Sequence, residues 1–370
     1  MNIVEATRGY EKWLAQQTNP IAADLRRKHT FMAEAVFPFF RATFYRWLQV
    51  WPELEKDVAH APKVLGVGDL HVENFGTWRD AEGRLAWGVN DFDEAWMFPY
   101  TIDLARLATS VLLAKDAEHL QERPKSVTDC LIQGYRDGLT DGGKPFVLAE
   151  GQDWLRSIAS QQLKDPNRYW ERLTSWPEVK VKDLPDVAIS RMTDMMPPHC
   201  DQPFYVARQA GLGSRGHERY VAIAHWNGGW VAREAKALVP SAAAWLAGTG
   251  RDRIYYNQIL QQSVRDHDPY FHVHEHWLVR RLAPDCTKIP ITELPTQRDE
   301  QTLLYCMGFE VANVHLGTKG AQKTILKDLD KRKGRWLYNN AREMRKAIRK
   351  DYAAWREAHP VAKAKAKSRP

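Results

Sequence analysis

The hydrophobic period of this chain of 370 residues is helical at both ends and strand-like in parts of the middle, and this pattern most limits the folds open to it. In residues 1–50, apolar side chains recur at steps of three and four, as on the buried face of a helix. From about Arg298 a helical pattern returns and continues to about His359. Between these regions, a helical pattern runs from Thr101 to about residue 165, and the Pro-containing stretch 166–200 is expected to be irregular. Short apolar runs then predict strands at 203–209, 220–226, 229–235 and 272–281. We therefore expect an α+β fold, in which both chain ends form a helical body around a β-rich module.

Composition places the chain among folded proteins without a membrane span. Charged residues make up 27% and hydrophobic residues 44% of the sequence, as in ordinary globular domains. No apolar run reaches the roughly 20 residues that cross a bilayer, because Arg106 and Thr109 interrupt the longest candidate. The four cysteines have no paired spacing and read as reduced packing residues. A cytoplasmic location is the expectation, and the oligomeric state is left open.

Positive charge gathers near the C-terminus. The net charge is +7, and the segment from Lys323 onward is rich in lysine and arginine. Such a segment suits an anionic partner such as nucleic acid, whereas a solvated helix face is the more common explanation. We expect the last residues, 360–370, to be a basic, disordered tail.

The strongest functional signal lies in two acidic segments, GDLHVENF (residues 68–75) and NDFDE (residues 90–94). Predicted strands at 73–78 and 85–91 join them through a turn at 79–83, which places Asn74 beside Asp91 at the base of a hairpin. Phosphoryl transfer needs a carboxylate near the acceptor hydroxyl and oxygen ligands for Mg²⁺. Asp69 fits the catalytic carboxylate, and Asn74 and Asp91 fit the metal ligands, with Asp93 as a lesser candidate. Loop Asp and Asn residues also cap helices and close turns, but two linked clusters favour the site.

A glycine loop, GLGSRG, lies between two predicted strands. The GxGxxG pattern occurs in many folds, but between strands it is typical of a flap over phosphates, where glycines admit the backbone closely. Its phosphate-covering residues would be Gly211, Gly213, Ser214 and Gly216. On the following strand, Arg233 and Lys236 are the candidates for neutralising phosphate. Their odd separation puts them on opposite strand faces, so only one can point at the phosphates, and Arg233 is slightly favoured.

These residues carry a resemblance to known families. GDLHVEN, DFDEA and the following YTIDLARLA resemble the catalytic and metal-binding loops of aminoglycoside phosphotransferases and choline kinases, which share the protein-kinase-like fold. More closely, the chain resembles the bacterial family called domain of unknown function 2252. That similarity includes FPFFRAT (residues 37–43), GDLHVENFG, DFDEA, the glycine loop, REAKALVPS and GFEVANVHLG. The resemblance implies a bilobal, kinase-like fold but supplies no reaction for the closer family.

The sequence departs from the kinase pattern in three respects. The glycine loop follows the catalytic loop, so a shared site requires circularly permuted lobes. Val67 stands two residues before Asp69, where a structural histidine is usual. No glutamate lies between Glu234 and Glu275 to pair with the lysine. These departures leave binding with weak or unusual catalysis open.

Other candidates are weighed against ordinary structural roles. The resemblance makes Arg41 and His315 candidate site residues, and His71 and Arg280 are further candidates that also fit a loop histidine and a surface ion pair. Three histidines, His272, His274 and His276, share one face of a predicted strand, a spacing that can ligate zinc. Their aromatic neighbours favour a packed strand instead.

We therefore expect a Mg²⁺-dependent phosphotransferase that moves the γ-phosphate of ATP to a small hydroxyl- or amino-bearing acceptor. The alternatives are an inactive nucleotide-binding regulator and a nucleic-acid-binding protein that uses the basic C-terminal segment. The expected organisation is a helical catalytic lobe, a β-rich nucleotide lobe, C-terminal helices and a tail, at 1–198, 199–290, 291–359 and 360–370. The acceptor, and the choice of ATP or GTP, are not specified by the sequence.

Overall fold

A computed structural model describes most of the chain. The described residues are 1–18, 20–54, 56–116, 124–148, 152–208, 218–249, 253–288 and 297–360. The four glycine-loop residues Gly211, Gly213, Ser214 and Gly216, and the tail from residue 361, lie outside them. Among the helices of the described part, none is both long and apolar enough to cross a bilayer.

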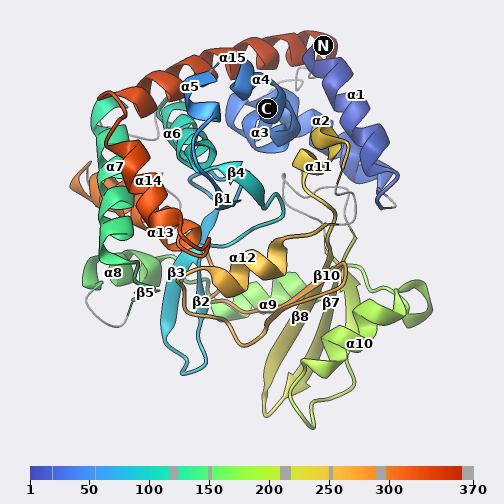
Figure 1. Ribbon diagram of the computed structural model, residues 1–370. Coiled ribbons are helices and arrows are strands. Elements are labelled where there is room, and N and C mark those ends of the chain that lie inside the picture. Colours follow the sequence, from blue (N-terminus) through green and yellow to red (C-terminus); the bar gives the residue numbers. More distant parts are fainter. Residues whose placement is uncertain are drawn as a thin grey trace, which may run out of the picture.

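Both chain ends contribute to one helical region, as the hydrophobic pattern predicts. Its helices are α1 (Ile3–Leu14), α2 (Ala22–Glu34), α3 (Val36–Ala42), α4 (Phe44–Leu54), α5 (Lys56–Ala59), α6 (Thr101–Asp116), α7 (Pro124–Asp141), α8 (Asp153–Gln161), α13 (Gln297–His315), α14 (Ala321–Leu329) and α15 (Trp336–Ala358). Helix α15 runs across the top of Figure 1, above the N-terminal helices. One apolar core joins side chains of α1, α3, α6, α7, α13 and α15.

Two of these helices, α7 and α13, pack unusually closely. A Cβ at Gly134 of α7 would lie 1.9 Å from the carbonyl oxygen of Tyr305 in α13. Only glycine admits this approach, because any side chain at that point would meet backbone. The tight pair holds α13 against the hairpin described next, with Glu310 of α13 accepting from the backbone N–H of Val89 at 3.1 Å.

Two small sheets lie beside the helical region. Strands β1 (Lys63–Gly66) and β4 (Trp96–Pro99) pair antiparallel, and β2 (Phe75–Arg79), β3 (Leu85–Val89) and β5 (Phe146–Val147) form a three-stranded antiparallel sheet. The predicted hairpin is confirmed, with Phe75 opposite Val89 in the register. The chain therefore leaves β1, makes the hairpin, and returns through β4 to α6, so that both acidic segments lie at one end of the hairpin.

The β-rich module is a five-stranded antiparallel sheet in the order β6-β7-β8-β10-β9. Its strands are β6 (Phe204–Ala207), β7 (Arg219–Trp226), β8 (Gly229–Ala237), β9 (Phe271–His274) and β10 (Trp277–Leu282). The single strand predicted at 272–281 is wrong, because the chain reverses at Glu275, where φ is +51°, and forms two strands. The molecule is thus a mixed α+β chain with several sheets, as Figure 1 shows.

Helices cover both faces of this sheet. Tyr169 and Leu173 of α9 (Pro166–Thr174) pack against Val221 and Ile223, while Ala188 and Met192 of α10 (Asp186–Asp194) pack against the opposite face. The stretch 166–200 was predicted to be irregular, and this prediction is wrong: it contains α9, the short η1 (Val181–Asp183) and α10. Two of its prolines lie at helix starts instead of interrupting helices: Pro166 is at the first position of α9, and Pro185 is the residue before α10.

Candidate active site

The loop after β1 carries Asp69 and is fixed by a buried carboxylate. Asp103 of α6 accepts hydrogen bonds from the backbone N–H groups of Val67 and Gly68, at 2.7 and 2.8 Å. Gly68 has φ +84°, and a Cβ there would lie 2.5 Å from the carbonyl oxygen of Glu94. Glycine is therefore required both for the backbone conformation and for the approach of the second acidic segment.

A buried histidine supports the same carboxylate. His315 of α13 lies 2.9 Å from Asp103 through Nε2 and 2.8 Å from the hydroxyl of Tyr135 through Nδ1. The position two before Asp69 holds Val67, so the imidazole beneath this loop comes from the far end of the chain. His315 is fully buried and positions the loop without lining the pocket.

Arg106 of α6 binds and orients the carboxylate of Asp69. The guanidinium donates to Asp69 Oδ1 through Nε at 2.8 Å and also through Nη2, and donates to the carbonyl of Phe40 at 3.0 Å. Arg106 is fully buried, with its guanidinium carbon 4.1 Å from the centre of the Phe40 ring. Burial raises the pKa of Asp69, although Arg106 opposes the rise. Because Oδ1 takes both bonds from Arg106, Oδ2 is the oxygen that no hydrogen bond from a described residue occupies.

The base of the hairpin joins the two acidic segments. The amide nitrogen of Asn74 donates to the carbonyl oxygens of Asp91 at 3.0 Å and Asp69 at 3.3 Å. The backbone N–H of Asn90 donates to the carbonyl of Asn74 at 2.9 Å. The predicted juxtaposition of Asn74 and Asp91 is therefore present. Since both carbonyls face the amide nitrogen, Oδ1 of Asn74 is its atom available as a ligand.

Lys236 connects the five-stranded sheet to these carboxylates. Its ammonium donates to Asp91 Oδ1 at 3.2 Å and to Asp93 Oδ2, and only 2% of its surface is exposed. Lys236 belongs to β8 and shares its strand face with Ala232 and Glu234. Arg233 points to the opposite face, where it donates to the carbonyl of Met195 at 2.9 Å. The alternation of side chains along a strand separates the two candidates: Lys236 lies on the face of the sheet that meets the hairpin, and Arg233 lies on the other face.

Charge and burial give the neighbouring acids different proton affinities. Burial alone raises the pKa of Asp91, but the charges of Lys236 and Arg219 reverse this, and the pKa of Asp91 lies below its ordinary value. Burial, and then the charge of Asp91, raise the pKa of Asp93 to about 6. Burial raises the pKa of Glu94 to about 7, against hydrogen bonds from Ser241 and from the backbone of Ala242. Asp91 is thus the most strongly ionised of the three.

A second charged cluster lies on the same face of the sheet. Glu234 is fully buried and binds Arg208 through Oε1 at 2.6 Å and Arg280 through Oε2 at 2.6 Å. Arg219 lies 3.5 Å from the same Oε1. Burial alone raises the pKa of Glu234, but these arginines hold it well below its usual range. One carboxylate therefore orients three guanidinium groups, and positive charge exceeds negative charge within this cluster.

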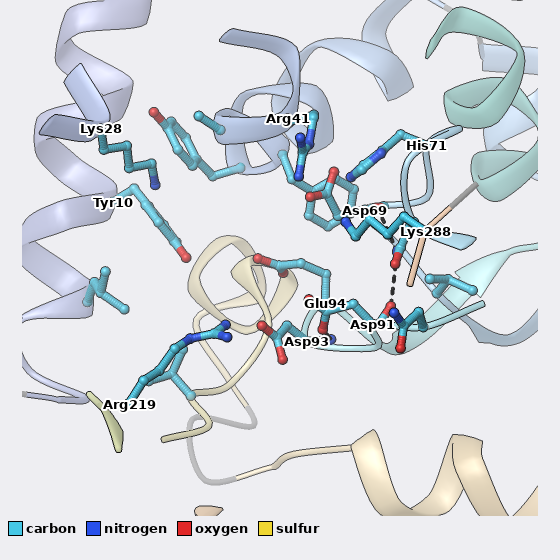
Figure 2. A pocket seen from close by; sticks show the side chains of 18 of the residues that line it. Tyr10, Lys28, Arg41, Asp69, His71, Asp91, Asp93, Glu94, Arg219 and Lys288 are labelled. Atoms are coloured by element: carbon cyan, nitrogen blue, oxygen red, sulfur yellow. Dashed lines mark hydrogen bonds between the residues drawn. The ribbon is translucent and has the colours of Figure 1, made fainter. Parts of the chain in front are cut away.

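The members of these clusters that line one pocket of about 210 Å³ are Asp69, Asn74, Asp91, Asp93, Glu94, Arg208, Arg219 and Arg280. Figure 2 shows Asp69, Asp91, Asp93 and Glu94 on one side of it, and Lys28 and Tyr10 on the other. Seven of the residues that the sequence singled out line it together: Arg41, Asp69, His71, Asn74, Asp91, Asp93 and Arg280. A neighbouring cavity of about 560 Å³ shares Asn90, Arg208, Arg280 and Lys288 with this pocket.

The other candidates from the sequence are Arg41, His71 and the three histidines His272, His274 and His276. Arg41 pairs with Glu73 at the pocket. His71 is buried, and burial lowers its pKa well below the usual value. His272 and His274 lie on β9, whereas His276 precedes β10 after the chain reversal, and His272 Nε2 lies 2.9 Å from the carbonyl oxygen of Pro269. Among the described residues, no group of three or more His, Cys, Asp or Glu side chains is arranged to hold a metal.

Several pocket residues were not identified from the sequence. Lys28 and Tyr10 lie on N-terminal helices, α2 and α1. The sequence pattern of such a helix does not distinguish a polar side chain that enters a pocket from one that faces solvent. Arg208, Arg219 and Glu234 lie in or next to predicted strands. The alternation of side chains along a strand shows which residues share a face of the sheet, but it does not show which face meets the pocket. Glu234 itself stands between the two residues Arg233 and Lys236 that were considered. A charged residue within an otherwise apolar strand was the available signal.

The comparisons with known proteins cover part of the chain. Residues 21–168 match the family described as "Uncharacterized protein conserved in bacteria (DUF2252)". The match includes both acidic segments and FPFFRAT, and it ends before β6, so the REAKALVPS and GFEVANVHLG segments lie beyond it. No curated protein and no solved structure matches the chain.

Proposed function

We propose that this pocket transfers a phosphoryl group from ATP to a small acceptor in a Mg²⁺-dependent reaction. The observation that carries the proposal is the contact of Lys236 with Asp91 and Asp93. It brings a cationic strand face, a candidate metal-binding hairpin and the Asp69 loop to one cavity. Phosphoryl transfer requires these three elements together and little other chemistry from the protein.

The donor half of the pocket is the side formed by the sheet. Arg208 and Arg280 are held by Glu234 with their positive charge beside the carboxylates, and guanidinium groups bind phosphate oxygens well. Both arginines also line the neighbouring cavity, whose walls include Trp78, Tyr169 and Trp176. Its volume of about 560 Å³ lies within the range of small-molecule sites. We propose that the nucleoside occupies this cavity and that its phosphates extend toward Asp91.

The residues present fit Mg²⁺. Oδ1 of Asp93 is buried without a hydrogen-bond partner, and a buried carboxylate oxygen of this kind is stabilised by a cation. Asp91 has 45% of its side chain exposed, and Asn74 has an available amide oxygen. One or two carboxylates are enough, because Mg²⁺ usually completes its shell with phosphate oxygens and water. When bound, the ion would neutralise charge on the phosphates.

Asp69 is the proposed acceptor-side carboxylate. Arg106 fixes its Oδ1, so Oδ2 is the atom that can orient an acceptor hydroxyl and accept its proton. Asp103 and His315 hold the loop in place. The proposed role of Lys236 is to keep Asp91 and Asp93 ionised and oriented, and to contact the phosphates when these displace part of its pairing.

A permuted, kinase-like arrangement of lobes belongs to the same proposal. The order of the elements supports it. In the sequence, the Asp69 loop and the hairpin come before the five-stranded sheet, yet Lys236 of that sheet contacts Asp91 of the hairpin. The glycine loop connects β6 to β7, two neighbouring strands of this sheet, as a flap over phosphates would require.

Calorimetric titration with ATP, with and without Mg²⁺, tests the proposal. Wild-type protein should bind ATP more tightly with the metal, and Asp91→Ala should lose at least 10-fold in affinity. Asp330→Ala is the matched control, because Asp330 forms an exposed ion pair with Arg136 on the helical surface. Failure of the well-folded wild type to bind any nucleotide would overturn the proposed function.

A further inference from the structure

Lys28 is a buried lysine without a partner. It lies on α2, only 5% of its surface is exposed, and it lines the pocket. Its ammonium has no hydrogen bond or ion pair with any described residue. The nearby Glu11 is already bound to His29, with Oε1 2.6 Å from the imidazole. Lys236, in contrast, forms ion pairs with two carboxylates, those of Asp91 and Asp93.

Such a lysine is costly to the unliganded protein. Burial lowers the pKa of Lys28, since the charged form loses water and gains no direct partner. A polar group in this position is normally satisfied by hydrogen bonds, so the missing partner points to something that enters the pocket.

The surrounding wall has the polarity of an anion site. Tyr10 stacks on Tyr45 with ring centres 4.4 Å apart, and in Figure 2 its hydroxyl and the Lys28 ammonium point into the same space. Arg41 adds a buried Nε that lacks a hydrogen-bond partner. The acids Asp69 and Glu94 lie across the pocket, where they would repel an anion and favour a hydroxyl.

We propose that the wall formed by α1, α2 and α3 binds the anionic group, carboxylate or phosphate, of a compact hydroxylated acceptor, with Lys28 as the principal cation. This inference rests on the proposed function and specifies its acceptor. Held by Lys28, the acid places its hydroxyl toward Asp69 Oδ2. The pocket of about 210 Å³ is smaller than the 300–1,000 Å³ typical of drug-sized ligands, which limits the acceptor to a small molecule.

Binding of D-glycerate, inorganic phosphate and glycerol tests this inference in the absence of nucleotide. Glycerate and glycerol share a three-carbon hydroxylated skeleton and differ in the anionic group. Wild-type protein should bind at least one anion in calorimetry, and glycerol at least 10-fold more weakly. Lys28→Met should lose at least 10-fold in affinity for that anion while its melting temperature, without ligand, stays equal or rises. The preferred anion distinguishes a carboxylate from a phosphate acceptor.

Two matched variants isolate the site. Lys12→Met removes an exposed lysine from the adjacent helix α1 and should bind the anion as wild type does. Arg136→Gln changes an arginine on the helical surface and should also retain glycerate binding. Equal anion affinities of Lys28→Met and wild type, or no anion binding by wild type, overturn the inference.

The two proposals fail separately. If wild type binds MgATP but no anion, the acceptor assignment alone is wrong. If it binds the anion through Lys28 but no nucleotide, the phosphotransferase proposal is wrong. If Lys28→Met loses MgATP affinity and keeps anion affinity, Lys28 contacts the nucleotide, which also contradicts the acceptor assignment.

Discussion

The ammonium of Lys236 lies 3.2 Å from Oδ1 of Asp91, although 145 residues separate them in the chain. The same ammonium reaches Asp93, so a single buried cation joins the five-stranded sheet to the hairpin. Removing this cation would leave two partly buried carboxylates side by side without their counter-charge.

Lys236→Met should therefore destabilise the fold and weaken nucleotide binding. Breaking a fully buried ion pair usually costs about 3–5 kcal/mol, but solvent screens Asp91 and Asp93, which are 45% and 21% exposed, so we expect a loss of about 1–3 kcal/mol. Urea denaturation should report a loss of that order, and MgATP affinity should fall at least 10-fold. Lys236→Arg keeps the charge and should retain more of both. Unchanged stability in Lys236→Met would contradict the observed pairing.

Asp103→Asn should loosen the Asp69 loop. The amide replaces a carboxylate that accepts from Val67, Gly68 and His315, and it presents an N–H where an acceptor is needed. An unsatisfied buried hydrogen-bonding group costs about 1–3 kcal/mol, so we expect a loss of that size in the free energy of unfolding. Asp330→Asn, at an exposed pair, should change it by less than about 1 kcal/mol. Equal losses in the two variants would argue against the anchoring role of Asp103.

Two glycines with positive φ provide a matched pair. Gly68 and Gly83 have φ of +84° and +75°, but a Cβ at Gly83 meets nothing within 4 Å. Gly83→Ala should lose about 1–2 kcal/mol from backbone conformation alone. Gly68→Ala should lose more and also weaken MgATP binding, since its Cβ displaces the segment at Glu94. Thermal melting and calorimetry of both variants separate the general conformational effect from the local one.

Arg208→Gln should weaken MgATP binding by at least 10-fold with little loss of stability. Its side chain is 29% exposed, and Glu234 keeps Arg280 as a partner, so the buried carboxylate remains paired. One charge-assisted contact to phosphate is worth about 1.5–3 kcal/mol, which gives a change of this size. Arg136→Gln, on the helical surface, is the control. Retained affinity in Arg208→Gln would remove this arginine from the donor site.

The pH dependence of stability should include a contribution from Glu310. Burial raises the pKa of Glu310 above its ordinary value, so the folded protein holds this proton more tightly than the unfolded chain. The resulting stability is present at acid pH and is lost as pH rises through the folded-state pKa. Glu310→Gln should therefore become more stable relative to wild type as pH rises from 4.5, the ordinary value, through the folded-state pKa, by about 1.4 kcal/mol for each unit of the shift. A series of urea denaturations upward from that pH measures the difference, and no change with pH would contradict the direction of the shift.

The sequence determined the parts of this protein that depend on nearby residues. The hydrophobic period was enough to predict the helical ends, the hairpin from Phe75 to Val89 and most strands of the five-stranded sheet. Because the hairpin is local, its turn also predicted that Asn74 would lie beside Asp91. Errors arose where local signals were ambiguous, as at 166–200, where prolines begin helices, and at Glu275, where a two-residue reversal interrupts a run of strand-forming residues.

Tertiary structure alone decided which distant groups share the pocket. Strand alternation predicted that Arg233 and Lys236 face opposite ways, but only packing of α10 on one face of the sheet decided which of them meets the hairpin. Likewise, nothing local distinguishes Lys28 from other lysines on an amphipathic helix, or marks His315 as the support for a loop almost 250 residues earlier. Burial and pairing depend on contacts between segments far apart in the chain, and these contacts determine the charge of the site.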